Sequence, residues 1–143
     1  MTHERHPARL RRRVDATPAA IAPLRRAVAG LASGAGFATD RVDDVALAVS
    51  EILTNVVVHA YRGDRDAGPV ELTAVACERG VEVTIADEGT GMRRRDDSPG
   101  LGLGLAMATM VADGVRVSAV RPSGTSVWLR FRRDGGRAGD GRQ

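Results

Sequence analysis

One segment, DRVDDVALAVSEILTNVVVHAY at residues 40–61, constrains the fold more than any other part of the sequence. Its apolar residues recur at steps of three and four, which predicts a helix with a broad buried stripe. Three polar side chains, Glu51, Asn55 and His59, interrupt that stripe every four residues. Such residues lie on one line of a helix, with Cβ atoms roughly 5–6 Å apart. Because buried polar groups need partners, this line calls for an explanation.

Two more helices and two hairpins are expected around this segment. Thr17 before Pro18 predicts an N-cap and a helix start, and Gly34 and Gly36 predict the end of that helix. Alternation of apolar and polar residues predicts strands, and glycines open one further helix. The expected strands are 10–16, 70–77, 80–87, 115–120 and 125–132, and the expected third helix is 101–113.

The order of these elements decides the predicted fold class. Helices come first, and two hairpins follow, separated by a glycine-rich loop and a helix. This order predicts an α+β fold, a two-layer sandwich with helices on one face of a mixed or mostly antiparallel sheet. We expect one domain over residues 10–132, a basic disordered tail at 1–9 and a second disordered tail at 133–143.

The charge is concentrated at the two ends of the chain. Residues 1–13 contain five Arg and one Glu, and residues 132–143 contain four Arg and two Asp, so these ends supply +4 and +2 of the net charge of +3. The body between them is therefore close to −3, and no basic patch on a folded face is expected. Every basic residue is Arg, which excludes the lysine of a Walker-type phosphate loop.

Cysteine content and hydropathy indicate the cellular location to expect for the protein. Cys77 is the one cysteine in the sequence, and we expect it to be a small buried residue. No apolar run approaches the roughly 20 residues that span a bilayer, and the N-terminus lacks the apolar stretch of a signal peptide. We therefore expect a cytoplasmic protein with no membrane contact.

The first two glycine-rich elements after the long helix suit a nucleotide. Asp87 at a strand exit can only accept hydrogen bonds, which suits the exocyclic amine of adenine, and Gly89 and Gly91 follow it. The glycines of GLGLGL, residues 100–105, would let the start of a helix approach a polyphosphate. Taken alone, the Asp87 motif is more typical of an ordinary Asp-Gly turn than of a binding site, and a glycine-rich helix start is often only a packing or capping device. A Rossmann fingerprint is excluded because an antiparallel hairpin precedes the glycines.

The motifs together resemble one family. They are similar, in order, to the four nucleotide boxes of the GHKL (Bergerat) ATPase fold shared by gyrase, the ninety-kilodalton heat-shock chaperone, histidine kinases and mismatch-repair ATPases. Over about residues 10–132 the chain resembles the anti-sigma-factor serine/threonine kinases, a single-domain branch. The matching motifs are Glu51-x-x-x-Asn55-x-x-x-His59-Ala60-Tyr61, Asp87-x-Gly89-x-Gly91, Gly100-x-Gly102-Leu103-Gly104-Leu105 and Gly124-Thr125.

The resemblance implies ATP and Mg²⁺ as cofactors and explains the polar line. Asn55 would hold Mg²⁺, and Glu51 would take the proton of an attacking hydroxyl or orient it. His59 is expected to have a structural role. The segment from Met92 to Pro99 would cover the triphosphate, where Arg93, Arg94 or Arg95 could contact the γ-phosphate or simply belong to a solvated loop. The implied ATP-binding residues are Asn55, Asp87, Gly89, Gly91, Gly100, Leu101, Gly102, Leu103, Gly104, Leu105 and Thr125.

The resemblance implies a kinase that phosphorylates a Ser or Thr of an anti-sigma-factor antagonist and sequesters an RNA polymerase sigma factor. The alternative is a module that binds ATP without transferring phosphate and only sequesters a transcription factor. A histidine-kinase fragment is disfavoured, because His3 to Pro7 lack the long helices of a phosphoacceptor box. Direct nucleic-acid binding is not expected, because no aromatic platform accompanies the Arg residues. A homodimer is a further expectation.

Overall fold

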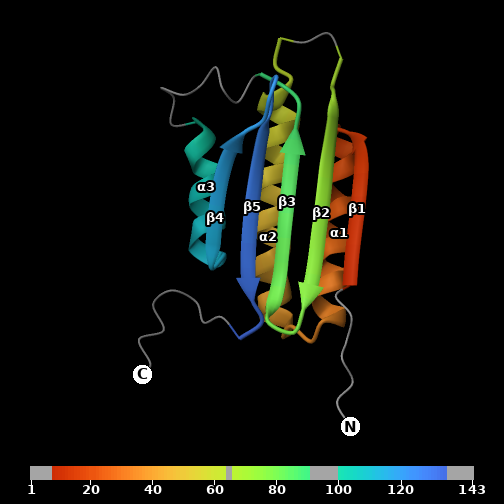
Figure 1. The fold of residues 1–143 in the computed structure, drawn as a ribbon, viewed down its shortest axis with the longest axis vertical. Coiled ribbons are helices and arrows are strands. Elements are labelled where there is room, and N and C mark those ends of the chain that lie inside the picture. The colour runs from red at the N-terminus through yellow and green to blue at the C-terminus, as the bar shows by residue number, and fades with distance from the viewer. Residues whose placement is uncertain (1–7, 64–65, 91–99, 135–143) are drawn as a thin grey trace.

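The part of the chain that the structure describes forms three helices, one π-helical turn and five strands (Figure 1). The computed structural model describes residues 8–63, 66–90 and 100–134, and only the backbone of residues 100–104. No helix in these ranges is both long and apolar enough to cross a bilayer. In chain order the elements are β1 (Ala8–Asp15), α1 (Pro18–Gly34), α2 (Thr39–Asn55), η1 (Val56–Ala60), β2 (Pro69–Cys77), β3 (Gly80–Asp87), α3 (Gly100–Val111), β4 (Gly114–Ala119) and β5 (Thr125–Arg132).

The strands form one sheet in the order β1-β2-β3-β5-β4. All four pairings are antiparallel, so the expectation of an antiparallel sheet is confirmed and a mixed sheet is not found among the described strands. The helices lie behind one face of the sheet, and the other face is open (Figure 1). The predicted α+β two-layer sandwich is therefore correct.

Alternation along the strands builds the core between the two layers. Val70, Leu72, Ala74 and Ala76 of β2 face the helices and are buried, while the residues between them are half-buried on the open face. The pattern repeats in β3 and β5, where successive side chains also point to opposite faces. Leu24, Val28 and Ala32 of α1 and the buried apolar residues of α2 pack on this surface.

The end of the long helix differs from its prediction. The sequence predicts one helix to Tyr61, but α2 ends at Asn55 and the chain continues as the π-helical η1. The backbone hydrogen bonds there therefore span five residues instead of four. Thr17 does precede α1, but its side chain makes no capping hydrogen bond.

Two expectations about the N-terminal end and the cysteine are wrong. β1 starts at Ala8, so residues 8 and 9 belong to the sheet rather than to a tail, and Arg9, Arg11 and Arg13 stand beside residues of the open face of β2. That face therefore carries basic side chains that the charge count assigned to a tail. Cys77 is exposed. Strand alternation explains its exposure, because Ala76 takes the buried position and Cys77 follows it at the end of β2.

Candidate nucleotide site

The floor of the candidate site is the junction between α2 and η1. Asn55 closes α2 and is 9% exposed, and Glu51 lies half-buried one turn earlier. Among the described residues, neither Asn55 Nδ2 nor Ser50 Oγ has a hydrogen-bond partner. A buried polar atom without a partner costs about 1–3 kcal/mol, so its retention in a helix points to a ligand.

A buried carboxylate lies at the exit of β3. Asp87 is 2% exposed, and its Oδ1 accepts a hydrogen bond of 3.0 Å from the Gly89 amide. Burial raises the pKa of Asp87 to about 6, and the charge of Glu88 adds to this effect, while hydrogen bonds from the backbone amides of Gly89 and Thr125 oppose it. At neutral pH the group is a carboxylate that can accept a hydrogen bond from a ligand.

Two close backbone approaches bring separate elements to Asp87. A Cβ on Gly89 would lie 1.9 Å from the carbonyl oxygen of Ala60, the last residue of η1. Gly124 has φ +127°, and a Cβ there would lie 2.1 Å from the carbonyl oxygen of Asp87. Both contacts therefore need a glycine. They join the end of η1, the exit of β3 and the start of β5 at one place.

The structure assembles most of the described predicted residues. Thr125 is buried and lies opposite Asp87 in the register of β3 and β5. Leu105 is half-buried and packs against the core. Residues 100–104 form the first turn of α3, and nothing is described of their side chains. Gly91, Arg93, Arg94 and Arg95 lie outside the described residues, so these predictions are not tested.

The residues present fit a magnesium nucleotide. The amide oxygen of Asn55 is a hard ligand, and rotation of the side-chain amide can put this oxygen where the unpartnered Nδ2 lies. Asp87 offers an acceptor for an amine. Two hollows of about 570 and 880 Å³ lie elsewhere, around Ala8 and Glu78 and around Arg79 and Asp134. Neither hollow contains Asn55 or Asp87, the described residues whose chemistry suits a nucleotide.

Sequence reasoning missed several polar residues. Arg41 and Asp44 of α2 are buried and pair with each other, and Asp113 completes their ion-pair cluster. Their (i, i+3) spacing on an apolar helix was the one local signal. Tyr61 was part of a matched motif but received no role, although its hydroxyl contacts Glu88 beside Asp87.

Comparison with known proteins agrees with this geometry. A family described as the histidine kinase-like ATPase domain matches residues 14–131. Serine-protein kinase RsbW of Bacillus licheniformis is 33% identical over 139 residues, covering 85% of this chain and 86% of the relative. Its namesake in Bacillus subtilis strain 168 is 33% identical over 120 residues, covering 73% and 74%. A shorter alignment, to another B. licheniformis RsbW, spans 54% of that relative.

A solved structure is similar in fold. The RsbU and RsbW domains of a Mycobacterium tuberculosis protein match with a TM-score of 0.69 and 24% identity, over 87% of this chain and 32% of the longer one. The family match spans most of the chain, and the similar solved structure agrees with the two-layer fold. This chain belongs to the histidine kinase-like ATPase family and, within it, to the RsbW group of serine-protein kinases.

Proposed function

We propose that this chain is an ATP-dependent serine/threonine protein kinase that acts as an anti-sigma factor in the cytoplasm. It phosphorylates an anti-sigma-factor antagonist and sequesters a sigma factor. The observation that supports this most is the buried Asn55, whose amide nitrogen has no partner among the described residues. Asn55 lies one helical turn from Glu51 and at the same end of the molecule as the buried Asp87.

The nucleotide would lie between these groups. The carboxylate of Asp87 accepts a hydrogen bond from the 6-amino group of adenine, and the start of α3 receives the phosphates, where backbone amides without helical partners favour anions. The amide oxygen of Asn55 would hold Mg²⁺. Bound ATP would supply the γ-phosphoryl group, and the metal would supply positive charge to the phosphates.

Glu51 is the proposed catalytic residue. It is half-buried on α2, one turn before Asn55, and a carboxylate there can take the proton of a serine hydroxyl as the hydroxyl attacks. Glu51 acts on the protein substrate and Asn55 on the metal, so binding and transfer are separable by mutation.

The test is transfer of labelled γ-phosphate to the cognate antagonist. We expect Glu51→Gln to lower the rate by about a hundredfold, because general base catalysis contributes roughly 10²–10⁴. ATP affinity should remain within about threefold of the wild-type value, since the phosphates and base keep their contacts. The matched control is Glu78→Gln, an exposed acid in the β2–β3 turn at the other end of the sheet. A wild-type chain that binds ATP but phosphorylates no antagonist contradicts the kinase and leaves an ATP-binding sequestering module.

A further inference from the structure

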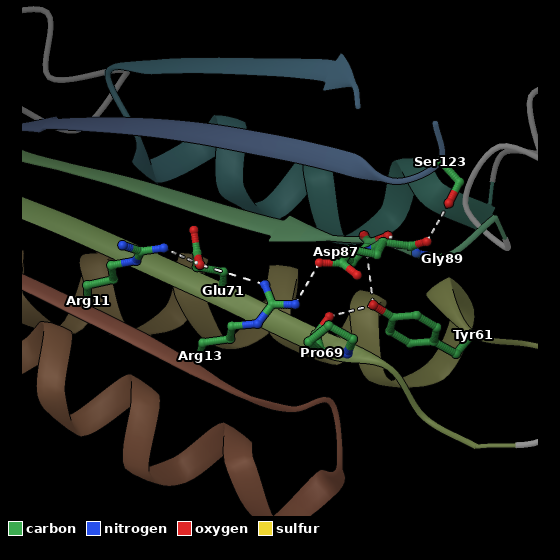
Figure 2. Close-up of polar contacts among 9 residues, drawn as sticks. Arg11, Arg13, Tyr61, Pro69, Glu71, Asp87, Gly89 and Ser123 are labelled. Atoms are coloured by element: carbon green, nitrogen blue, oxygen red, sulfur yellow. Dashed lines mark hydrogen bonds and ion pairs between the residues drawn. The ribbon is translucent and has the colours of Figure 1, made fainter. Parts of the chain in front are cut away.

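Glu88 lies between Asp87 and Gly89, at a position to which the sequence motif assigns no role. Its amide, its carbonyl and its carboxylate are each bound by a different part of the chain (Figure 2). We call these the Glu88 contacts. They are made by Tyr61, which follows η1, by Ser123 in the turn before β5, and by Arg13 of β1.

Tyr61 holds the peptide unit before Glu88. Its hydroxyl accepts a hydrogen bond of 2.9 Å from the Glu88 amide and donates one of 2.5 Å to the carbonyl oxygen of Pro69. The ring fills the space beside two glycines, because a Cβ would lie 2.3 Å from it at Gly68 and 3.1 Å at Gly89. Burial raises the pKa of Tyr61, so the hydroxyl keeps the proton that it donates to Pro69.

Ser123 holds the peptide unit after Glu88. Its Oγ donates a hydrogen bond of 2.6 Å to the Glu88 carbonyl oxygen. The amide of that same planar unit is the N–H of Gly89, which donates to Asp87 Oδ1. Rotation of this peptide would therefore break the hydrogen bond that orients the Asp87 carboxylate.

Arg13 adds a weaker contact. Its Nη2 lies 2.8 Å from Glu88 Oε2, and its Nη1 lies 3.7 Å from Glu71, which also pairs with Arg11 at 2.9 Å (Figure 2). The side chains of Arg13 and Glu88 are both about half exposed, at 52% and 53%. Exposed ion pairs contribute little, so most of the restraint comes from Tyr61 and Ser123.

We propose that Tyr61 and Ser123 are positioning residues that fix the Asp87–Gly89 turn and thereby determine selectivity for the 6-amino group of the base. This inference rests on the proposed function, because it assumes that Asp87 receives adenine. The inference rests on geometry, because residues outside the turn fix both peptide units that flank Glu88. The second of these units carries the Gly89 amide, which orients the Asp87 carboxylate.

The test compares ATP with purine riboside triphosphate, which lacks the 6-amino group. Calorimetric titration with Mg²⁺ gives the affinity of each nucleotide for the wild type, Tyr61→Phe and Ser123→Ala, with Ser118→Ala as the control. Ser118 is an exposed serine of β4 whose side chain makes no hydrogen bond in the described structure. Asp87→Ala gives the preference for ATP over purine riboside triphosphate that is expected when the acceptor is lost.

We expect the wild type to prefer ATP by about tenfold or more, as one buried hydrogen bond allows. Tyr61→Phe and Ser123→Ala should each lower that preference by about threefold or more, toward the value of Asp87→Ala, while Ser118→Ala keeps it. A purely structural role would weaken both nucleotides equally and leave the preference unchanged.

The outcomes separate the two proposals. If the wild type prefers ATP and both variants keep that preference within about twofold, this inference is overturned and the nucleotide site stands. If the wild type binds neither nucleotide, the proposed function fails and this inference fails with it. Melting temperatures show which variants fold, and Ser123→Ala decides the question if Tyr61→Phe does not fold.

Discussion

The two ends of α2 differ in whether their buried polar groups have hydrogen-bond partners. At its N-terminal end, Arg41 is 5% exposed and all three of its side-chain nitrogens donate hydrogen bonds. At its C-terminal end, Asn55 is almost as buried, yet its Nδ2 has no partner among the described residues. One helix therefore contains a polar cluster that the protein satisfies by itself and a polar group that it leaves for something else.

The Arg41 cluster, made of Arg41, Asp44 and Asp113, joins four elements. Arg41 reaches the Val111 carbonyl at the end of α3 at 2.6 Å and the Arg132 carbonyl at the end of β5 at 3.1 Å. Its guanidinium also lies 5.5 Å from the centre of the Phe131 ring. Asp113, just before β4, accepts from Arg41 and from the Arg132 amide. The cluster fixes the end of α3 that lies away from the candidate phosphate site.

This contrast separates stability from binding. A satisfied polar cluster contributes to folding, and the loss of its cation leaves the carboxylates without a compensating charge. An unsatisfied buried group opposes folding and is retained where function needs it. Mutations at the N-terminal end of α2 should therefore mainly change stability, and mutations at its C-terminal end should mainly change ligand binding.

The largest effect is expected at the Arg41 cluster. Arg41→Ala leaves Asp44 and Asp113 without their cation, so we expect the free energy of unfolding to fall by about 3–5 kcal/mol. Urea denaturation measures this, with Arg26→Ala as the control because Arg26 is exposed on α1. A loss below about 1 kcal/mol would remove the distinction between the two ends.

Asn55→Ala should give the opposite result. We expect the affinity for Mg-ATP to fall by about a hundredfold, because the metal loses a ligand, while the free energy of unfolding changes by less than about 1 kcal/mol. Calorimetry and urea denaturation on the same preparation check both parts. A large loss of stability with ATP affinity intact would show that Asn55 is an ordinary core residue.

Gly89→Ala tests the close approach that joins η1 to the Asp87 turn. The new Cβ would lie 1.9 Å from the Ala60 carbonyl oxygen, so the backbone must move. We expect a loss of about 1–3 kcal/mol in stability together with weaker ATP binding. Gly30→Ala is the matched control: it lies in α1 with nothing within 4 Å, and should stabilise the chain by up to about 1 kcal/mol. Equal effects of the two substitutions would mean that the approach at Gly89 is unimportant.

The last effect is the pH dependence that Asp87, the acid proposed to contact the base, gives to stability and binding. Burial raises the pKa of Asp87 from 3.8 to about 6, so the folded state holds a proton that the unfolded state has lost between these values. The free energy of unfolding should therefore decrease as pH rises through this window, and Asp87→Asn should remove that decrease. ATP affinity should fall below about pH 6 by up to tenfold per pH unit, as the acceptor becomes protonated.

Asp87→Asn also serves as the control for this titration, because the phosphates of ATP titrate in both chains. The difference between the two affinity profiles isolates the Asp87 proton. Parallel profiles for the two chains would show that Asp87 does not contact the base.

The sequence predicts the element types well because each depends on local periodicity. The alternation of Val70, Leu72, Ala74 and Ala76 and the helical spacing of Val45, Val49 and Ile52 survive in the structure as the buried faces of β2 and α2. The candidate site follows partly from motif order, since Asn55, Asp87 and Thr125 are brought to one end of the fold.

What could not be predicted depends on contacts between distant residues. Arg41 meets Asp113 across 72 positions, and Arg13 meets Glu88 across 75, so neither pair leaves a local pattern. The π-turn of η1 was missed because VVVHA continues the apolar pattern of α2 and only the hydrogen bonds differ. Cys77 was misplaced because its position at the end of β2 was given less weight than its residue type.

A Mg-ATP titration followed by backbone amide NMR tests the central claim most directly, because it reports on both ends of α2 at once. We predict shift changes concentrated at residues 55–61, 87–90 and 124–125, with residues 41, 113 and 131–132 unchanged. Changes confined to the Arg41 end, or no change at saturating nucleotide, would contradict the account.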